Sequence, residues 1–420
     1  MNTNITVPER WETKRLGEVC EINPKIPNKE NIPDDLEVQF LPMKLVEEII
    51  GKIHLLETRK YDEVKKGYTP FVNDDVLFAK VTPCMENGKI AVVNNLKNDI
   101  GFGSSEFHVI RPTKSILSKY IFHFIVQNRF RHEAAKEMTG AVGLRRVPKQ
   151  FIENYIIPLP PLPEQQAIVA KIEELLSDLE NGKQQLQTAG QQLKIYRQSL
   201  LKWAFEGKLT NENVKDGELP KGWEWVQIQD IATVGTGATP LKGKREYYDA
   251  GKIAWVTSGA LNNEFVNEAT DYVSEKALKE TNLSIYPKHT LLLAMYGEGK
   301  TRGKCSELLI ESTTNQAIAA IYFNNHDIRV KPFLKYFLLK NYNDIRRLSS
   351  GGVQPNLNLG IVKKTLLPFP PMEEQNRIVE ILESKLTICD KLEETINQSL
   401  QQAETLRQSI LKKAFEGKLV

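Results

Sequence analysis

The segment AMYGEGKT at residues 294–301 has the residue types of a nucleotide-binding loop. In such a loop Lys300 and the threonine after it would be ligands of a bound nucleotide. The pattern is relaxed, because Ala294 replaces the first glycine, and a phosphate cradle also needs a helix that begins directly after it. Gly303 and an apolar run follow instead, which predict a turn and another strand. We expect a basic strand-to-strand loop whose Lys300, Arg302 and Lys304 could meet phosphates. A nucleotide-hydrolysing P-loop protein remains a third alternative.

Other groupings typical of catalysis are weaker. Asp34, Glu63 and Lys65 can be arranged as a nuclease-like pattern, but 26% of the residues are charged, so this coincidence is expected. The glycine-rich VGTGATP at 234–240 lacks the spacing of a dinucleotide-binding motif. The four cysteines and six histidines show no metal-binding spacing. The sequence therefore predicts no catalytic site, no metal site and no bound cofactor.

The remaining candidate chemistry is that of arginine, lysine, amide and hydroxyl side chains in predicted turns. These types contact phosphates and read base edges in DNA. In the first half of the chain the candidates are Lys80, Thr82, Lys89, Ser104, Ser105, Arg145, Arg146 and Lys149. In the second half they are Thr239, Lys242, Lys244, Arg245, Thr257, Ser258, Tyr296, Lys300, Arg302, Asn315, Gln316, Gln354 and Asn356.

The elements around these turns belong to a head-to-tail duplication with an offset of 210 residues. QSLLKWAFEGKL at 198–209 recurs as QSILKKAFEGKL at 408–419, and PLPPLPEQQAIVAKIEELL at 158–176 is matched by PFPPMEEQNRIVEILESKL at 368–386. Between these landmarks the two halves diverge almost completely. Divergent turns within a repeated frame are expected if the two halves read different sequences.

Apolar residues at heptad spacing predict two long helices that pack on each other. The prolines before each copy stop an incoming helix and permit a new one to start. We assign helix packing to Ile172, Leu175, Leu179, Leu186, Leu193 and Leu200 in the first copy, and to Leu392, Ile396, Leu406 and Ile410 in the second. Trp203 is assigned to the same seam, where its counterpart is Lys413.

The regions before the helices alternate short apolar runs with turns and predict mixed, β-rich domains. We expect an α+β chain with domains at 1–157 and 211–367 and helical spacers at 158–210 and 368–420.

The sequence has no run of 18 apolar residues, so no membrane span is predicted. The scattered cysteines and the lack of an apolar leader favour a location in the cytoplasm. The net charge of only +3 is lower than expected for a protein that coats DNA without specificity.

The duplicated helix starts and the two AFEGKL endings resemble the specificity subunit of a type I restriction–modification system. GATPLKGKREYYDAGKIAWVTSGAL at 237–261 and EINPKIPNKENIPDDLEVQFLPM at 21–43 resemble parts of that family's recognition domains. The resemblance covers essentially the whole chain, in order.

This resemblance implies a non-catalytic, sequence-specific subunit that binds double-stranded DNA. Each of two target-recognition domains would read one half of a bipartite asymmetric site. The two helices would pack as an antiparallel coiled coil with pseudo-twofold symmetry, set the half-site spacing and dock the methyltransferase subunits. S-adenosylmethionine would belong to those subunits, and ATP to the restriction (translocase) subunits. The alternative is a coiled-coil scaffold whose β-rich domains bind proteins.

Overall fold

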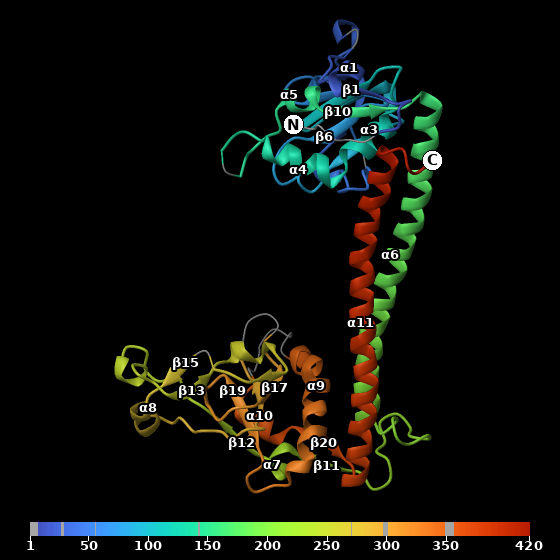
Figure 1. Ribbon diagram of the computed structural model, residues 1–420. Coiled ribbons are helices and arrows are strands. Elements are labelled where there is room, and N and C mark those ends of the chain that lie inside the picture. Colours follow the sequence, from blue (N-terminus) through green and yellow to red (C-terminus); the bar gives the residue numbers. More distant parts are fainter. Residues whose placement is uncertain are drawn as a thin grey trace. The chain divides into compact units, whose positions relative to one another are not determined.

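The computed structural model describes residues 7–26, 29–54, 56–141, 143–269, 271–296, 301–348 and 357–420. The chain divides into two compact units, which can be followed by colour in Figure 1. Unit 1 comprises Met1–Gln187 together with Asn397–Val420, and unit 2 comprises Thr188–Ile396. Each unit therefore contains one variable region of the duplication and a part of both long helices.

Unit 1 is built on two four-stranded sheets. Its strands are β1 (Glu12–Arg15), β2 (Cys20–Ile22), β3 (Glu37–Leu41), β4 (Glu57–Lys60), β5 (Thr69–Val72), β6 (Val76–Ala79), β7 (Ile90–Val92), β8 (Ile100–Gly103), β9 (Phe107–Pro112) and β10 (Ile156–Leu159). Its shorter helices are α1 (Leu16–Val19), α2 (Tyr61–Val64), α3 (Ser118–Ile125), α4 (Asn128–Lys136) and α5 (Lys149–Asn154). One sheet has the order β2-β9-β6-β7 and the other β4-β3-β8-β5, with β3 and β8 parallel.

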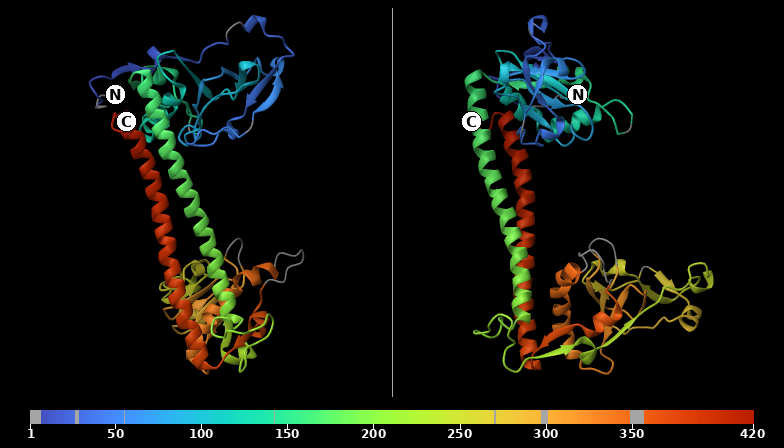
Figure 2. Two further views of the ribbon diagram at one scale, coloured as in Figure 1. Left: turned by 90° about the vertical axis from the view of Figure 1, so that its right-hand side faces the viewer. Right: turned by 180° about the vertical axis from the view of Figure 1, so that it is seen from behind.

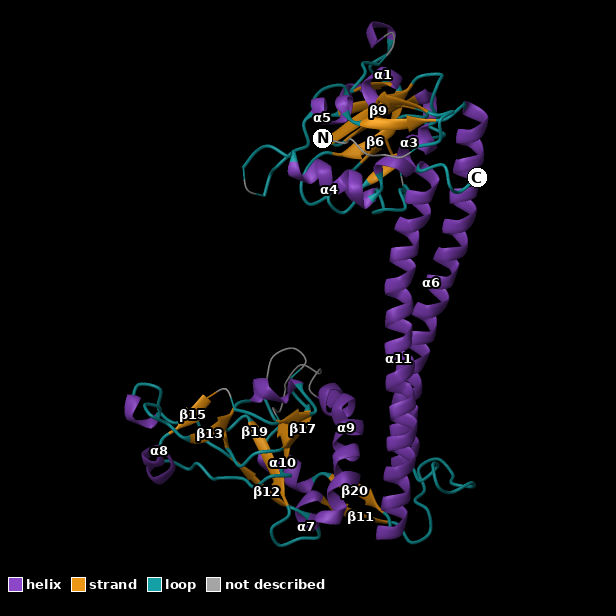
Figure 3. Ribbon diagram, viewed as in Figure 1, coloured by secondary structure: helices purple, strands orange, loops and turns teal. Residues whose placement is uncertain are grey.

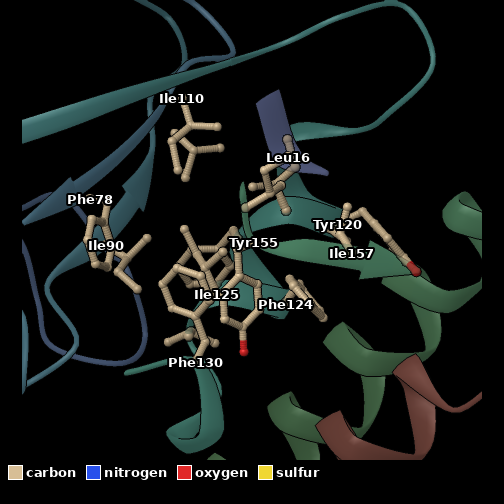
Figure 4. Packing of buried hydrophobic residues seen from close by; sticks show 14 of the residues in the cluster. Leu16, Phe78, Ile90, Ile110, Tyr120, Phe124, Ile125, Phe130, Tyr155 and Ile157 are labelled. Atoms are coloured by element: carbon tan, nitrogen blue, oxygen red, sulfur yellow. The ribbon is translucent and has the colours of Figure 1, made fainter. Parts of the chain in front are cut away.

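Strand β6 is the centre of the core of unit 1, because all four of its side chains are buried. Val76 and Phe78 pack with α3, α4 and the ends of the long helices, whereas Leu77 and Ala79 pack with residues of the second sheet. Figure 4 shows Phe78 near Phe130 of α4, and their ring centroids are 5.7 Å apart. A strand that is buried on both faces provides a rigid support for the turn that follows it.

Unit 2 repeats this arrangement in a different sequence. Its strands are β11 (Glu224–Gln227), β12 (Thr233–Thr236), β13 (Ile253–Val256), β14 (Phe265–Val266), β15 (Asp271–Val273), β16 (Leu291–Ala294), β17 (Cys305–Leu308), β18 (Thr313–Thr314), β19 (Ile318–Tyr322) and β20 (Leu366–Phe369). Its shorter helices are α7 (Ile228–Ile231), α8 (Glu275–Glu280), α9 (Lys331–Leu348) and α10 (Leu359–Lys364). The order β12-β19-β16-β17 repeats β2-β9-β6-β7, and the parallel pair β13–β18 repeats β3–β8. Strand β14 extends the larger sheet, and Figure 3 shows the strands of both units.

A two-stranded antiparallel ribbon leads into each long helix. Strand β1 pairs with β10 in unit 1, and β11 pairs with β20 in unit 2. The domain limits expected after residues 157 and 367 fall inside β10 and β20. The first strand of each variable region therefore pairs with the strand just before the long helix, and this pairing ties the helix start to its own domain.

The long helices α6 (Leu162–Phe205) and α11 (Met372–Phe415) are 44 residues each and run along each other in both views of Figure 2. Their pairing is antiparallel in both units. In unit 2, Arg197 donates to Asp390. Gly190 lies next to Ile396, since a Cβ atom added to this glycine would be 3.8 Å from the Ile396 Cγ2 atom. In unit 1, Glu180 faces Arg407. Rising residue numbers in α6 thus meet falling numbers in α11.

A buried glutamine is repeated at the start of both long helices. Gln165 is fully buried; its amide donates to the carbonyls of Pro160 (2.9 Å) and Ser115 (3.0 Å), and its oxygen accepts from the Leu117 N–H (3.0 Å). In the second copy Gln375 donates to the Pro370 carbonyl at 2.8 Å. Gln165 thus fastens the start of α6 to the domain before it, whereas the Gln375 bond is local to the start of α11; a buried polar group is retained where it is hydrogen-bonded.

Three residues predicted to lie in the helix seam are exposed instead. Leu392 is 49% exposed, Leu406 51% and Trp203 41%. The buried residue follows directly in two of these cases, where Arg407 and Ala204 are 6% and 0% exposed. The prediction was wrong there because apolar periodicity cannot identify a charged or small residue as a seam position. Of the other residues assigned to packing, Ile172, Leu200 and Ile410 are buried, and Leu175, Leu179, Leu186, Leu193 and Ile396 are half-buried.

In the part of the chain that the structure describes, no helix is long and apolar enough to cross a membrane. The same residues contain no group of three or more histidine, cysteine or carboxylate side chains that could hold a metal ion.

Candidate nucleic-acid interface

Equivalent turns carry most of the candidate residues of unit 1 and five of the thirteen candidates of unit 2. In unit 1 these are the β6–β7 turn (80–89), the β8–β9 turn (104–106) and the loop before α5 (139–148). In unit 2 they are the β16–β17 turn and the β18–β19 turn (315–317). The antiparallel pairs β6–β9 and β16–β19 place the two turns of each unit at the same end of the sheet, because Ala79 pairs with Phe107 and Ala294 with Ile318.

Backbone hydrogen bonds join the three turns of unit 1 into one surface. The Lys80 N–H donates to the Glu106 carbonyl at 2.9 Å, and the Val147 N–H donates to the Lys80 carbonyl at 2.9 Å. The Thr82 N–H donates to the Arg145 carbonyl at 3.2 Å. This surface contains Lys80, Thr82, Ser104, Ser105, Arg145 and Arg146 of the predicted set.

Glu106 lies within this surface and was missed by the sequence prediction. Arg146 donates to both of its carboxylate oxygens, from Nε at 2.8 Å and from Nη2 at 2.7 Å. This hydrogen bonding holds the pKa of Glu106 below its usual value. The fork of two parallel donors that binds Glu106 has the geometry that also matches the O6 and N7 acceptors of guanine. Glu106 could have been found from its place beside Ser104 and Ser105, in the turn between two apolar runs.

Two other cationic groups differ in environment. Burial lowers the pKa of Lys80, and Arg145, whose side chain is 45% exposed, lies 3.7 Å from Glu86. The Thr82 hydroxyl is buried and has no hydrogen-bond partner. The surface therefore presents cations that are only partly neutralised, whereas the Thr82 hydroxyl is not exposed on it.

Two predicted residues of unit 1 are engaged elsewhere. The Lys89 ammonium donates to the carbonyls of Val46 (3.1 Å) and Met43 (3.4 Å), so it fastens the β6–β7 turn to its own domain. The DNA contact predicted for Lys89 has no support in this geometry, because its donors are directed into the protein. Lys149 is half-exposed at the start of α5 and pairs with Glu153 at 2.9 Å.

The corresponding turns of unit 2 bring hydroxyl and amide groups together. The Thr239 hydroxyl donates to the Gln316 side chain, and the Asn315 N–H donates to the Val256 carbonyl at 3.0 Å. Thr257 and Ser258 follow Val256 directly, and the residue before Tyr296 is hydrogen-bonded to the β18–β19 turn through the Ala317 carbonyl. Thr239, Thr257, Ser258, Tyr296, Asn315 and Gln316 thus come from segments that the backbone joins.

The basic residues of unit 2 are more dispersed. Lys244 donates to the Tyr247 hydroxyl at 3.0 Å and lies 3.5 Å from Glu280, so it packs within its own domain. Lys242 and Arg245 are exposed on the same segment, and Arg302 is half-buried beside β17. Lys300, Gln354 and Asn356 lie outside the described residues.

The nucleotide-binding alternative requires a helix directly after the 294–301 loop, and the structure has a strand there. Gly303 donates to the Ala294 carbonyl at 2.9 Å, and β17 begins at Cys305. A strand therefore follows the loop where a phosphate-binding loop needs the start of a helix.

Comparison with known proteins agrees with this architecture. A family model described as the type I restriction modification DNA specificity domain matches residues 8–188 and again residues 220–402. The specificity subunits of the type I restriction enzymes EcoAI and EcoEI from Escherichia coli are 28% and 26% identical. Those alignments cover 94% and 95% of this chain and 80% and 81% of the relatives.

Solved structures share the fold. The HsdS subunit from Thermoanaerobacter tengcongensis is 21% identical and aligns over 98% of both chains with a TM-score of 0.67. A chain from a structure on complex assembly and conformational transition of the type I restriction–modification system is 22% identical, aligns over 98% of this chain and 99% of its own, and has a TM-score of 0.78. The two family matches cover both recognition regions, and the protein belongs to the family of type I restriction–modification DNA specificity subunits.

Proposed function

We propose that this chain is the sequence-reading, non-catalytic subunit of a type I restriction–modification complex, and that each unit reads one half of a bipartite DNA site. The observation that carries the proposal is the pair of equivalent turn surfaces. Both lie at the same end of the same four-strand order, yet one presents Arg145, Arg146 and Lys80 and the other Asn315, Gln316 and Thr239. The two turn surfaces occupy equivalent places in their units but carry different side chains, as expected if they read two half-sites of different sequence.

The proposed site residues are those of the joined turns. In unit 1, Arg146 and Arg145 are the candidates for base edges or phosphates, and in unit 2 the amides of Asn315 and Gln316 suit bidentate contact with adenine. The helices α6 and α11 would set the half-site separation. Methyltransferase subunits with S-adenosylmethionine, and restriction subunits with ATP, would supply the chemistry in the cytoplasm, where the DNA is.

A domain exchange tests the proposal. A host that carries this gene and its partner methyltransferase gene should methylate a bipartite motif, which mapping of modified bases would reveal. Replacing residues 1–157 by the corresponding region of another specificity subunit should change one half of that motif and leave the other half intact. A change in both halves, or in neither, would contradict the assignment of one half-site to each unit.

The scaffold alternative makes a different prediction. Phosphate contacts release counterions, so affinity for duplex DNA should fall steeply with salt. A scaffold that binds proteins through these domains would give no such duplex binding, even in the assembled complex.

A further inference from the structure

Arg407 is a charged residue in the seam of the long helices. It is 94% buried, its Nη1 lies 4.0 Å from the Glu180 carboxylate, and its Nε has no hydrogen-bond partner. Its Nη2 donates to the carbonyl of Ile49, at 3.3 Å, in the recognition domain of unit 1. Burial of an incompletely paired guanidinium is costly, so a seam optimised for helix packing alone would favour an apolar residue at this position.

The equivalent residue in the other copy, 210 positions earlier, is Arg197. It is also in the seam, but its Nη2 donates to Asp390 at 2.6 Å and to Glu393 at 3.2 Å, both on α11. The Nε of Arg197, like that of Arg407, has no hydrogen-bond partner, but two carboxylates of α11 neutralise the Arg197 guanidinium within the helix pair. Arg407 has a more distant carboxylate and makes its hydrogen bond to a backbone carbonyl of the recognition domain instead.

The turn that Arg407 contacts supports the β6–β7 turn. Ile49 has a φ of +66°, a conformation that costs a β-branched residue energy and persists only where its surroundings hold it. Its N–H donates to the Gly88 carbonyl at 2.9 Å, while its carbonyl accepts from Arg407. Beside it, the Asn87 amide donates to Glu48 at 2.9 Å. Ile49 thus connects the seam of the helices to the turn that carries Thr82.

We infer that Arg407 is a positioning residue for the DNA-reading surface of unit 1. It holds the 47–51 turn, which holds the 80–89 turn against the turns that carry Arg145 and Arg146. The inference rests on the proposed function, because it assigns a consequence for one half-site. If Arg407 served only the helix pair, its loss would act on both half-sites alike.

The test uses the assembled complex with its methyltransferase subunits. Duplexes with single base changes in either half-site are compared by competition binding, after the domain exchange has shown which half unit 1 reads. Arg407→Met should reduce discrimination in that half by roughly tenfold, the equivalent of one lost charged hydrogen bond, and should leave the other half unchanged. Arg407→Lys, which keeps a charged donor, should restore part of the discrimination.

Arg197→Met is the matched control, since it removes the equivalent seam arginine without touching the 47–51 turn. It should leave discrimination in the unit 1 half-site intact. Equal losses in both half-sites, the same loss in Arg197→Met, or no loss in Arg407→Met would overturn the inference.

If Arg407→Met does not fold, Gly88→Ala tests the contact between the 47–51 turn and the 80–89 turn instead, because the new Cβ atom would lie 2.7 Å from the Ile49 Cδ1 atom. It should produce the same loss in one half-site, and unchanged discrimination would refute the link. If the unmodified complex recognised no bipartite site, the proposed function itself would fail.

Discussion

The buried glutamine at each helix start offers a matched pair of perturbations. Gln165 makes three hydrogen bonds, to Leu117, Ser115 and Pro160, whereas Gln375 is equally buried but makes one, to Pro370, and leaves its side-chain oxygen without a partner. The same substitution to alanine therefore removes different numbers of interactions from two otherwise equivalent sites.

The expected magnitudes follow from the number of bonds lost. A net hydrogen bond contributes about 1 kcal/mol, so Gln165→Ala should destabilise unit 1 by about 3 kcal/mol. Gln375→Ala should destabilise unit 2 by about 1 kcal/mol, because one of its two polar groups is already unsatisfied. The cavity left by the side chain adds to both values and largely cancels in their difference.

Hydrogen exchange measures each site separately. In Gln165→Ala the amide of Leu117 loses its acceptor and should exchange faster, and the amides of the first turns of α6 should lose protection with it. In Gln375→Ala the first turns of α11 should change less. Equal destabilisation by the two substitutions would refute the reasoning that the number of hydrogen bonds at this motif sets its stability.

Three further predictions concern recognition, pH and spacing. If Arg146 reads a base, Arg146→Ala should lower discrimination at one base pair by about five- to 150-fold and leave the slope of log affinity against log salt concentration unchanged. If Arg146 contacts a phosphate, the substitution should weaken binding to all duplexes and reduce that slope by about 0.9. Binding titrations at several salt concentrations distinguish the two, and unchanged discrimination with an unchanged slope would exclude Arg146 from the interface. Burial lowers the pKa of His123 to about 3, so the unfolded state binds more protons between about pH 6.5 and 3, and unit 1 should lose stability as the pH falls through that window. Urea unfolding at several pH values should show this loss reduced in His123→Leu, and an unchanged pH dependence would contradict it. Insertion of seven residues near Gly190 should increase the number of base pairs between the two halves of the methylated motif. The same number of base pairs after the insertion would argue against the spacing role of the helices.

The sequence alone was sufficient for the local and repeated features. Heptad spacing and the proline pairs predicted two long helices, and the structure has both, from Leu162 and from Met372, with identical lengths. These features depend on residues a few positions apart, so they can be recognised without knowledge of the rest of the fold. The offset of 210 residues and the two conserved endings likewise identified the duplication and the family.

Only the tertiary structure decided which residues meet across long distances in the chain. The two variable regions share a strand order that their divergent sequences do not reveal, because strand pairing is non-local and many sequences satisfy it. Glu106 and Arg146 are 40 residues apart and meet only once β6, β9 and the loop before α5 are assembled. Arg407 looks like a surface residue beside an apolar Leu406, yet the seam buries the arginine and exposes the leucine. Periodicity identifies an apolar face, whereas a buried charge is positioned by the partners that the fold brings to it.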